Sequence, residues 1–179
     1  DLDDIKYNKM TVKMAEEGEK FTTLDGVERT LTSDMLVIGN QDKTLDLAGI
    51  MGGENSEIKD TTTSIFIEGA SFAKENIRAT SKKLGLRTEA SSRFEKGIDI
   101  NLAEEAVNRA CQLIEELGCG TVLNGMLDYY PQKEEVQKVT VNPVRINKLL
   151  GVNVPMDQFI NILESLEFKC NLVSSEVLE

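Results

Sequence analysis

The first third of the chain is divided into short apolar runs separated by turn-forming residues, and this spacing is the strongest constraint on the fold. The runs cover residues 10–15, 21–24, 27–31, 35–38 and 44–50. Each is long enough for a strand and too short for a helix. Asp25-Gly26 is the clearest hairpin signal, because glycine accepts the positive φ that a tight turn requires. We therefore expect residues 9–50 to be mostly β structure, with the continuous run 35–38 buried on both faces.

Helical periodicity follows this β-rich part. The apolar spacing predicts helices over residues 73–84 and 102–117, the first ended by Gly85 and the second by Gly118 and Gly120. The second helix is expected to pack a core-facing row made of the following residues: Leu102, Ala106, Ala110, Leu113 and Leu117. Between the β-rich part and these helices, the apolar run 64–67 predicts a buried strand that ends at Glu68. We therefore expect a strand-rich first half followed by a helical later part.

A polar stretch around residues 130–135 with Pro131 predicts a domain boundary, which divides the chain into residues 1–134 and 135–179. Beyond it, alternation predicts a strand over 136–141, and Asn142-Pro143 predicts the start of a helix that ends at Gly151. A second helix over 156–166 is expected to bury a stripe of apolar residues, namely Met156, Phe159, Ile160, Leu163 and Leu166.

Composition excludes several classes of function. The formal charge of −11 argues against a protein that binds nucleic acid over its whole surface, and the absence of histidine excludes imidazole catalysis and histidine-rich zinc sites. No apolar run approaches the roughly 20 residues of a membrane span, so we expect a soluble protein without membrane contact.

The chain has three cysteines and no C-x-x-C pair, so we expect them to act as small hydrophobic side chains in a reducing cytoplasm. Because the chain begins at Asp1 without methionine, we expect a fragment of a longer protein.

The loop Met51-Gly52-Gly53-Glu54-Asn55-Ser56 has two adjacent glycines that let a backbone approach a neighbour closely. It lacks the Gly-Lys-Ser/Thr of a nucleotide P-loop and is not followed by G-x-G-x-x-G. The neighbour is therefore expected to be either a sheet or a small ligand rather than a nucleotide phosphate.

Segment 74–97 is a basic island in an acidic chain, with seven basic and three acidic residues and a net charge of +4. Helical spacing places Arg78 and Lys82 on one face, where they suit either a local contact to phosphates or an ordinary solvated surface. The following run 85–97 is rich in hydroxyl and small side chains. Ala90 and Ser91 leave room for a ligand there, and the Thr88 hydroxyl suits the orientation of water or an ester.

Three ordered motifs resemble the B3/B4 editing domain of the bacterial phenylalanyl-tRNA synthetase β subunit. They are Ile50-Met51-Gly52-Gly53, residues 67–72 (Ile-Glu-Gly-Ala-Ser-Phe) and residues 85–99 (Gly-Leu-Arg-Thr-Glu-Ala-Ser-Ser-Arg-Phe-Glu-Lys-Gly-Ile-Asp). Residues 135–179 resemble the start of the adjoining B5 domain. The resemblance implies an α+β fold, in which a β-rich layered B3/B4-type domain is followed by a partial winged-helix-like B5 module.

The resemblance also implies an activity, the hydrolysis of tyrosine wrongly esterified to tRNA(Phe). By motif position, Glu68 resembles the carboxylate that receives the tyrosyl hydroxyl, Thr88 and Ala90 resemble pocket-lining residues, and Gly52 resembles the glycine of the pocket wall. Phenylalanine and tyrosine differ by one hydroxyl, and a site built to hydrogen-bond it rejects the other by about 10⁴- to 10⁵-fold. No side-chain nucleophile is needed, because an aminoacyl ester is already activated and a positioned water suffices.

Further expectations concern partners and cofactors. The resemblance implies an α subunit in an α2β2 enzyme, tRNA(Phe) as partner, and tyrosine as the ligand of the editing site. Possible tRNA contacts are Arg78, Lys82, Lys83 and Arg87. No metal or cofactor is expected in this segment, whereas ATP and magnesium are implied for the full enzyme. The alternative is a non-catalytic domain that supports the catalytic subunit and positions tRNA, in which the motifs serve structure only.

Overall fold

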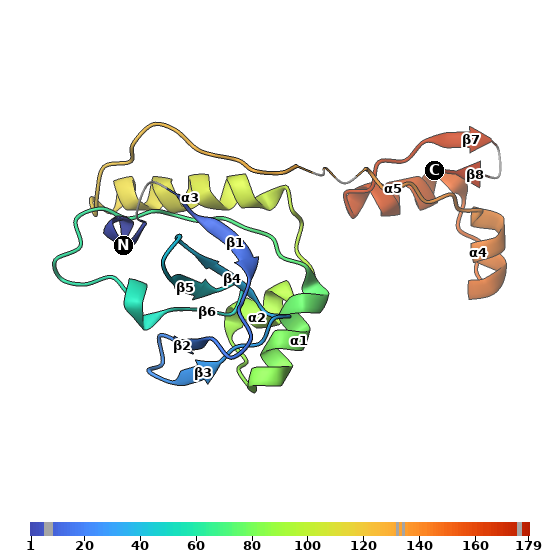
Figure 1. Cartoon of the computed structure of the whole chain (residues 1–179). Coiled ribbons are helices and arrows are strands. Elements are labelled where there is room, and N and C mark those ends of the chain that lie inside the picture. The colour runs from blue at the N-terminus through green and yellow to red at the C-terminus, as the bar shows by residue number, and fades with distance from the viewer. Residues whose placement is uncertain (6–8, 132, 134, 175–176) are drawn as a thin grey trace. The chain divides into compact units, whose positions relative to one another are not determined.

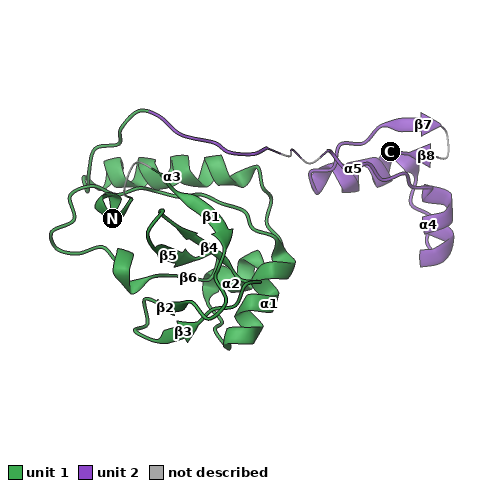
Figure 2. Ribbon diagram, viewed as in Figure 1, with its two compact units in different colours: residues 1–124 green, residues 125–179 purple. Residues whose placement is uncertain are grey.

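A computed structural model describes residues 1–5, 9–131, 133, 135–174 and 177–179. The chain forms two compact units, Asp1–Asn124 and Gly125–Glu179, which are coloured separately in Figure 2. Both contain helices and antiparallel strands, which confirms the α+β class. The units divide ten residues before the predicted boundary, and the assignment of residues 1–134 and 135–179 to two family domains stays a prediction.

The first unit is organised around a four-stranded antiparallel sheet in the order β1-β4-β5-β6 (Figure 1). Its strands are β1 (Thr11–Met14), β4 (Leu36–Gly39), β5 (Thr44–Leu47) and β6 (Met51–Gly52). Strand β4 lies between two partners and is largely buried, as its continuous apolar sequence predicted. The register of β5 and β6 sets Asp46 opposite Gly52.

The predicted hairpin is present as β2 (Lys20–Thr22) and β3 (Glu28–Thr30). Gly26 in its turn has a φ of 73°, and the Asp25 carboxylate accepts hydrogen bonds from the Thr23 hydroxyl and the Val27 amide. The amide of Leu24 donates to the carbonyl of Gly52 at 3.0 Å, so the hairpin is attached to β6.

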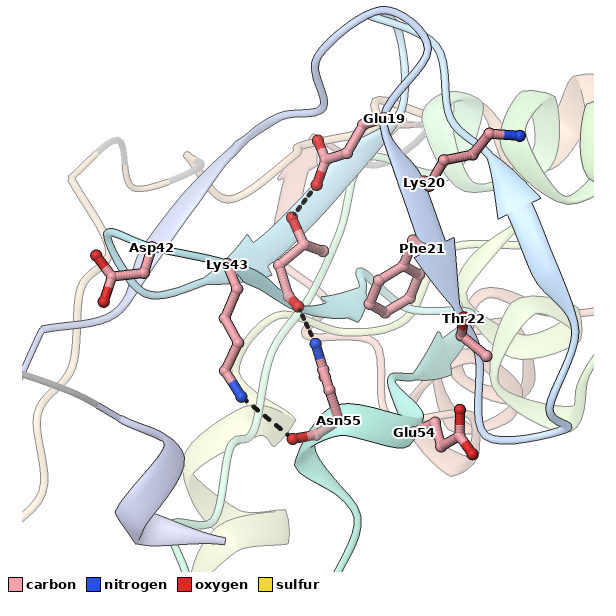
Figure 3. A pocket seen from close by; sticks show the side chains of 9 residues that line it. Glu19, Lys20, Phe21, Thr22, Asp42, Lys43, Glu54 and Asn55 are labelled. Atoms are coloured by element: carbon pink, nitrogen blue, oxygen red, sulfur yellow. Dashed lines mark hydrogen bonds between the residues drawn. The ribbon is translucent and has the colours of Figure 1, made fainter.

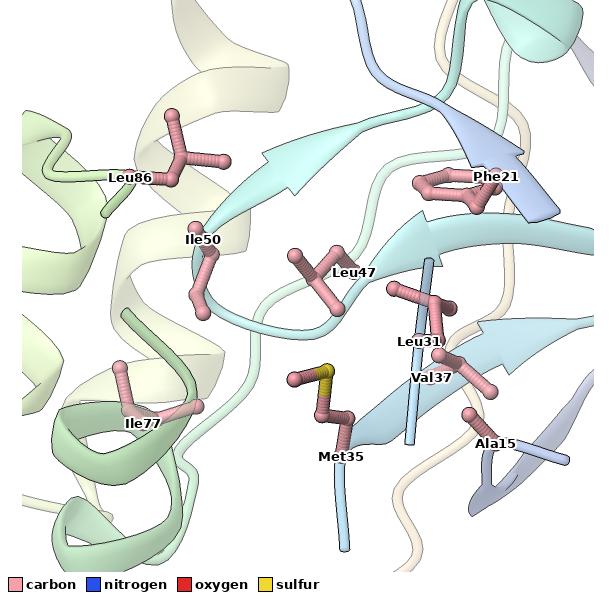
Figure 4. Packing of buried hydrophobic residues seen from close by; sticks show 9 residues of the cluster. All are labelled: Ala15, Phe21, Leu31, Met35, Val37, Leu47, Ile50, Ile77 and Leu86. Atoms are coloured by element: carbon pink, nitrogen blue, oxygen red, sulfur yellow. The ribbon is translucent and has the colours of Figure 1, made fainter. Parts of the chain in front are cut away.

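Three helices accompany the sheet: α1 (Lys74–Leu84), α2 (Glu89–Phe94) and α3 (Leu102–Glu116). Short 3-10 helices cover Leu2–Asp4 (η1) and Glu54–Ser56 (η3). Gly85 ends α1 in the left-handed conformation, with a φ of 61°, as predicted. Ile77 of α1 and Leu86 close the core from the helical side (Figure 4). The strands and loops contribute Ala15, Phe21, Leu31, Met35, Val37, Leu47 and Ile50.

The predicted core face of α3 is wrong, although the helix has the predicted extent. The predicted row is largely exposed, with Leu102 at 50% and Leu117 at 73% exposure. A neighbouring row is the better covered one, made of Ala103, Val107, Ala110, Cys111 and Ile114. Successive residues lie about 100° apart around a helix, so the covered face is turned by about one residue from the predicted one.

The buried strand predicted over 64–67 is also wrong. Residues 57–73 form no strand or helix, and Ile65 and Phe66 are 46% and 49% exposed. This segment joins η3 to α1 and runs beside α3 (Figure 1). At Gly69 it approaches so closely that a β-carbon there would lie 2.5 Å from Val107 Cγ2 and 2.7 Å from the carbonyl oxygen of Ala103. The segment is thus held by a helix rather than by a strand.

The second unit contains α4 (Pro143–Leu150), α5 (Met156–Ser165), β7 (Leu172–Ser174) and β8 (Val177–Leu178). The Asn142 side chain caps α4 by accepting a hydrogen bond from the Arg145 amide, and Gly151 ends the helix, as predicted. The strand predicted over 136–141 is wrong, since only Val141 forms a bridge, with Leu178. The predicted stripe of α5 is partly covered, except for Leu166, which is exposed.

All three cysteines, Cys111, Cys119 and Cys170, are free. Among the described residues, no helix is long and apolar enough to cross a membrane.

Candidate functional site

The glycine pair at the end of β6 is required by close packing. A β-carbon at Gly53 would lie 2.8 Å from the carbonyl oxygen of Leu45 and 2.8 Å from the Phe21 ring. At Gly52 it would lie 3.2 Å from Leu24 Cδ1 and 3.9 Å from an Asp46 carboxylate oxygen. These two glycines therefore let the backbone approach the sheet and the β2–β3 hairpin closely. The small surface of Gly52 lies between an apolar side chain and a carboxylate.

Asp46 is a carboxylate within an otherwise buried strand. It lies on β5 between Leu45 and Leu47, both of which are buried. Burial raises the pKa of Asp46 to about 6. Within the described part of the chain, its side chain forms no ion pair and accepts no hydrogen bond that would offset this cost.

Glu68 carries the second carboxylate of the site. Glu68 is an exposed residue, and the protein atoms near its carboxylate remove enough solvent to raise its pKa to about 7. Desolvation is the larger cause, and repulsion by the Asp46 carboxylate adds to it. Glu68 is thus close enough to Asp46 for their charges to interact, and it adjoins Gly69, which contacts α3.

Thr88 holds the start of α2 against the sheet. Its hydroxyl donates to the carbonyl of Ile50 at 2.8 Å and accepts from the Ser91 amide at 3.0 Å, as the N-cap of α2. The Ser91 hydroxyl accepts in turn from the Thr88 amide at 2.8 Å, which completes a capping box. The single hydroxyl proton of Thr88 is thus committed to the protein, and one lone pair is left for a ligand or water.

Three of the predicted pocket residues, Gly52, Glu68 and Thr88, are linked indirectly, through Asp46 and Ile50. Thr88 bonds to Ile50, two residues before Gly52, and Gly52 lies opposite Asp46, which interacts with Glu68. The segment that carries Glu68 also contacts α2, since the ring of Phe72 packs edge-on against Phe94 at the end of that helix, with 5.0 Å between ring centroids. Ala90 lies in the first turn of α2, two residues after Thr88, and is half-buried.

A basic hollow of about 490 Å³ lies at the C-terminal end of α1 and the end of α2. It is lined by Arg78 and Lys82 of α1, by Arg87 after the Gly85 cap, and by Glu95 and Lys96. It therefore brings together three of the four predicted tRNA contacts and adds Lys96 to them. Lys83 lies elsewhere, because its ammonium group pairs with Asp34 at 3.0 Å and donates to Thr32.

A second hollow of about 480 Å³ is formed by β2, the turn between β4 and β5, and η3 (Figure 3). Its polar groups bond mainly to one another. The Thr44 hydroxyl donates to Glu19 at 2.6 Å, and Asn55 Nδ2 donates to the carbonyl of Thr44 at 2.9 Å. Lys43 pairs with Asp4 and donates to the carbonyl of Asn55. These bonds fix the local structure, and no predicted site residue lines this hollow.

Among the described residues, no group of three or more His, Cys, Asp or Glu side chains is arranged to hold a metal ion. The glycine-rich loop at Gly52-Gly53 packs against the sheet and the hairpin.

Asp46 is the site residue that the sequence interpretation missed. The available signal was a lone carboxylate within the apolar run 44–50, flanked by two leucines. A single carboxylate on a strand ordinarily faces solvent, so the run by itself does not mark Asp46 as a site residue. The structure sets it opposite Gly52 and within the electrostatic range of Glu68 instead.

Comparisons with known proteins agree with the motifs. The family model described as the B3/4 domain matches residues 1–119. The phenylalanine–tRNA ligase beta subunit of Clostridium acetobutylicum is 48% identical over 163 residues, covering 91% of this chain and 21% of that protein. The protein of the same name from Geobacter metallireducens is 45% identical over all 179 residues, which cover 22% of its length.

A third such beta subunit, from Carboxydothermus hydrogenoformans, is 43% identical over 177 residues, which cover 99% of this chain and 22% of that protein. The chain thus spans about a fifth of the length of the curated relatives that it matches. These similarities confirm the resemblance identified from the sequence motifs. Because the family model covers about two thirds of the residues, the chain belongs to the B3/4 domain family.

Proposed function

We propose that the chain is part of the β subunit of a phenylalanine–tRNA ligase and that its first unit removes tyrosine from mischarged tRNA(Phe). The names of the relatives support the first part of the proposal. The second part depends on one observation, the Glu68 carboxylate, which is close enough to Asp46 for the two charges to interact and has a raised pKa. A carboxylate that has a raised pKa and no donor among the described residues suits a ligand that brings its own hydroxyl.

The discrimination between tyrosine and phenylalanine follows from this chemistry. Ionised Glu68 accepts a hydrogen bond from the phenolic hydroxyl, and this bond restores part of the solvation that burial removed. A phenylalanyl group offers no donor and leaves the carboxylate unpaired. The half-buried Ala90 at the start of α2 has a small side chain, which leaves space for the aromatic ring.

Hydrolysis needs only a positioned water. The water oxygen forms a bond to the ester carbonyl carbon, the bond from that carbon to the ribose oxygen breaks, and a water proton passes to the ribose oxygen. The products are free tyrosine and uncharged tRNA. Thr88 holds α2 in place, and its remaining lone pair is suited to accept a hydrogen bond from the water or from the substrate amine.

The experiment measures deacylation of Tyr-tRNA(Phe) by the complete enzyme carrying Glu68→Ala or Ala90→Trp. We expect Glu68→Ala to slow deacylation by about 10- to 100-fold, the value of one hydrogen bond to a charged group. Ala90→Trp fills the space for the ring and has a similar effect, while charging with phenylalanine is unchanged for both variants. Wild-type deacylation rates in both variants would contradict the assignment of both residues.

A second candidate function is a non-catalytic domain that supports the catalytic subunit and positions tRNA. This function is favoured by the hydrogen bonds of the Thr88 hydroxyl, because both are made to the protein backbone and stabilise the fold. Under this hypothesis, loss of charge in the basic hollow weakens tRNA binding, and Glu68→Ala has no effect on deacylation. The same assay therefore separates the two candidates.

The wider proposal concerns the complete protein. Residues 135–179 would begin a winged-helix-like B5 module, and the partner would be an α subunit in an α2β2 enzyme of the cytoplasm. ATP and magnesium would act at the aminoacylation site of that enzyme. The relatives' names as ligase beta subunits support an α partner.

A further inference from the structure

The basic hollow beside α1 combines unpaired cations with an open, concave shape. Arg78, Lys82 and Lys96 are in no ion pair with any residue that the structure describes. Arg87 donates from Nε to the Ser92 hydroxyl at 3.1 Å, which orients its guanidinium group. One carboxylate, Glu95, also lines the hollow. In a chain with a formal charge of −11, such a concentration of positive charge favours an anion at this place.

One short turn connects the hollow to Thr88 of the candidate site. Residues 85–88 connect α1 to α2, with Gly85 and Arg87 lining the hollow and Thr88 bonded to Ile50 on the pocket side. Arg87 and Thr88 are consecutive, with roughly 3.8 Å between their Cα atoms, so a residue that lines the hollow directly precedes a residue of the candidate site. A ligand that fills the pocket and continues past this turn reaches the cations of the hollow.

We propose that the basic hollow holds backbone phosphates of an RNA strand whose aminoacylated end occupies the pocket of Glu68 and Ala90. This inference rests on the proposed function and adds a site for the nucleotides that precede the esterified ribose. Four cations from α1, the turn after it and the end of α2 suit a phosphodiester chain, because they contact charge without reading bases. Lys83 is outside this site, although it neighbours Lys82 in sequence.

The test measures the affinity of the complete enzyme for a minihelix of the tRNA(Phe) acceptor stem with a single-stranded 3′ end. One phosphate contact to a single strand contributes about 0.7 to the slope of log Kd against log salt, or about fourfold in Kd at about 0.15 M salt. We expect Lys82→Ala and Lys96→Ala to weaken binding by about this factor each and to reduce the salt slope. Lys83→Ala is the matched control on the same helix, and its Kd is expected to stay at the wild-type value.

A gain-of-function variant separates this proposal from a folding defect. Glu95→Gln removes the one carboxylate of the hollow and is expected to tighten minihelix binding several-fold. Equal losses for Lys82→Ala and Lys83→Ala, or no change for Lys82→Ala, Lys96→Ala and Glu95→Gln, would overturn the proposal. Displacement of the minihelix by inorganic phosphate at an equal concentration would indicate a free-phosphate site and would overturn it as well.

The kinetic constants distinguish this proposal from the proposed function. Hollow variants are expected to raise KM for Tyr-tRNA(Phe) with kcat unchanged, whereas Glu68→Ala lowers kcat. If the wild-type enzyme releases no tyrosine but the hollow variants still weaken minihelix binding, the editing function fails and the phosphate site stands. If deacylation depends on Glu68 but the hollow variants bind the minihelix with wild-type affinity, the phosphate site is wrong and the editing function is unaffected.

Discussion

Glu68 and Asp46 are two carboxylates that the fold holds near each other at a cost in stability. Burial raises both pKa values, to about 7 and about 6, and their mutual repulsion contributes to the shift of Glu68. Carboxyl groups whose ionised form is destabilised in this way are common at functional sites. At pH 8 both groups are ionised, and a phenolic hydroxyl donor relieves part of the cost.

The pH dependence of stability tests the position of Asp46. Its folded-state pKa of about 6 lies above the ordinary value of 3.8, so its contribution to stability is complete below pH 3.8 and is lost as the pH rises through 6. Asp46→Asn should therefore be more stable than the wild type above pH 7, by about 3 kcal/mol or roughly 6 to 12 °C in Tm. This difference should disappear near pH 3.5 in thermal unfolding followed by circular dichroism.

Asp34 is the matched control with the opposite sign. Hydrogen bonds from the Thr32 hydroxyl and from Lys83 lower the pKa of Asp34, so its contribution is present at neutral pH and is lost as the pH falls. Asp34→Asn should lower Tm at pH 7 and lose its effect in acid. A Tm for Asp46→Asn below that of the wild type at pH 8 would show that Asp46 is solvated or paired, contrary to the structure.

At the scale of elements, α3 organises the segment that carries Glu68. Residues 57–73 have no strand partner among the described residues, and Gly69 brings their backbone against Ala103 and Val107. The position of Glu68 thus depends on a contact between an irregular segment and a helix. Phe72, packed on Phe94, fixes the other end of this segment to α2.

Gly69→Ala tests this contact. The added methyl group would lie 2.5 Å from Val107 Cγ2 and 2.7 Å from a backbone oxygen, so we expect a loss of about 1–3 kcal/mol in the free energy of unfolding. Gly120→Ala is the control, because its new methyl group would lie at an ordinary 3.4 Å from Ile114. Urea denaturation compares the two, and equal stability of both variants with the wild type would show that the segment does not pack on α3.

Elements with local signals could be predicted from the sequence. Asp25-Gly26, Gly85 and Asn142-Pro143 specify a hairpin, a helix end and a helix start through their own backbone chemistry. The strands expected over 64–67 and 136–141 did not form, because a strand needs a neighbour and an apolar run does not reveal one.

The covered face of α3 could not be chosen from its periodicity. The row from Leu102 to Leu117 and the row from Ala103 to Ile114 both have apolar members at helical spacing. Tertiary contacts such as the close approach of Gly69 to Ala103 and Val107 decide between them. For the site, the motifs supplied Glu68, but the pairing of Asp46 with Gly52 depends on sheet register, which the sequence interpretation did not include.

Two features of the whole molecule bear on the proposed function: its uneven charge distribution and the irregular segment in which the first unit ends. The net charge of −11 conceals a basic island on α1 and α2, which lies in the first unit together with the candidate pocket. The second unit contributes none of the proposed site residues. Residues 117–131, in which the first unit ends, contain neither helix nor strand.

Limited digestion with chymotrypsin tests this division. Leu127 and Tyr129 are 95% and 90% exposed and lie outside regular structure, so the first cleavages are expected after these residues. The expected products begin at Asp1 and end at residue 127 or 129, as mass spectrometry would show. First cleavages after Phe21 or Leu31, both buried in the core, would contradict the compact first unit.

The most direct test of the central claim is a crystal structure of the protein with bound tyrosine, determined at about pH 8, where Glu68 is ionised. The proposed function predicts the phenolic oxygen within about 2.5–3.0 Å of a Glu68 carboxylate oxygen, with the ring next to Ala90. Phenylalanine under the same conditions should give no density at this site. Tyrosine bound elsewhere, or bound here with its hydroxyl pointing away from Glu68, would contradict the account.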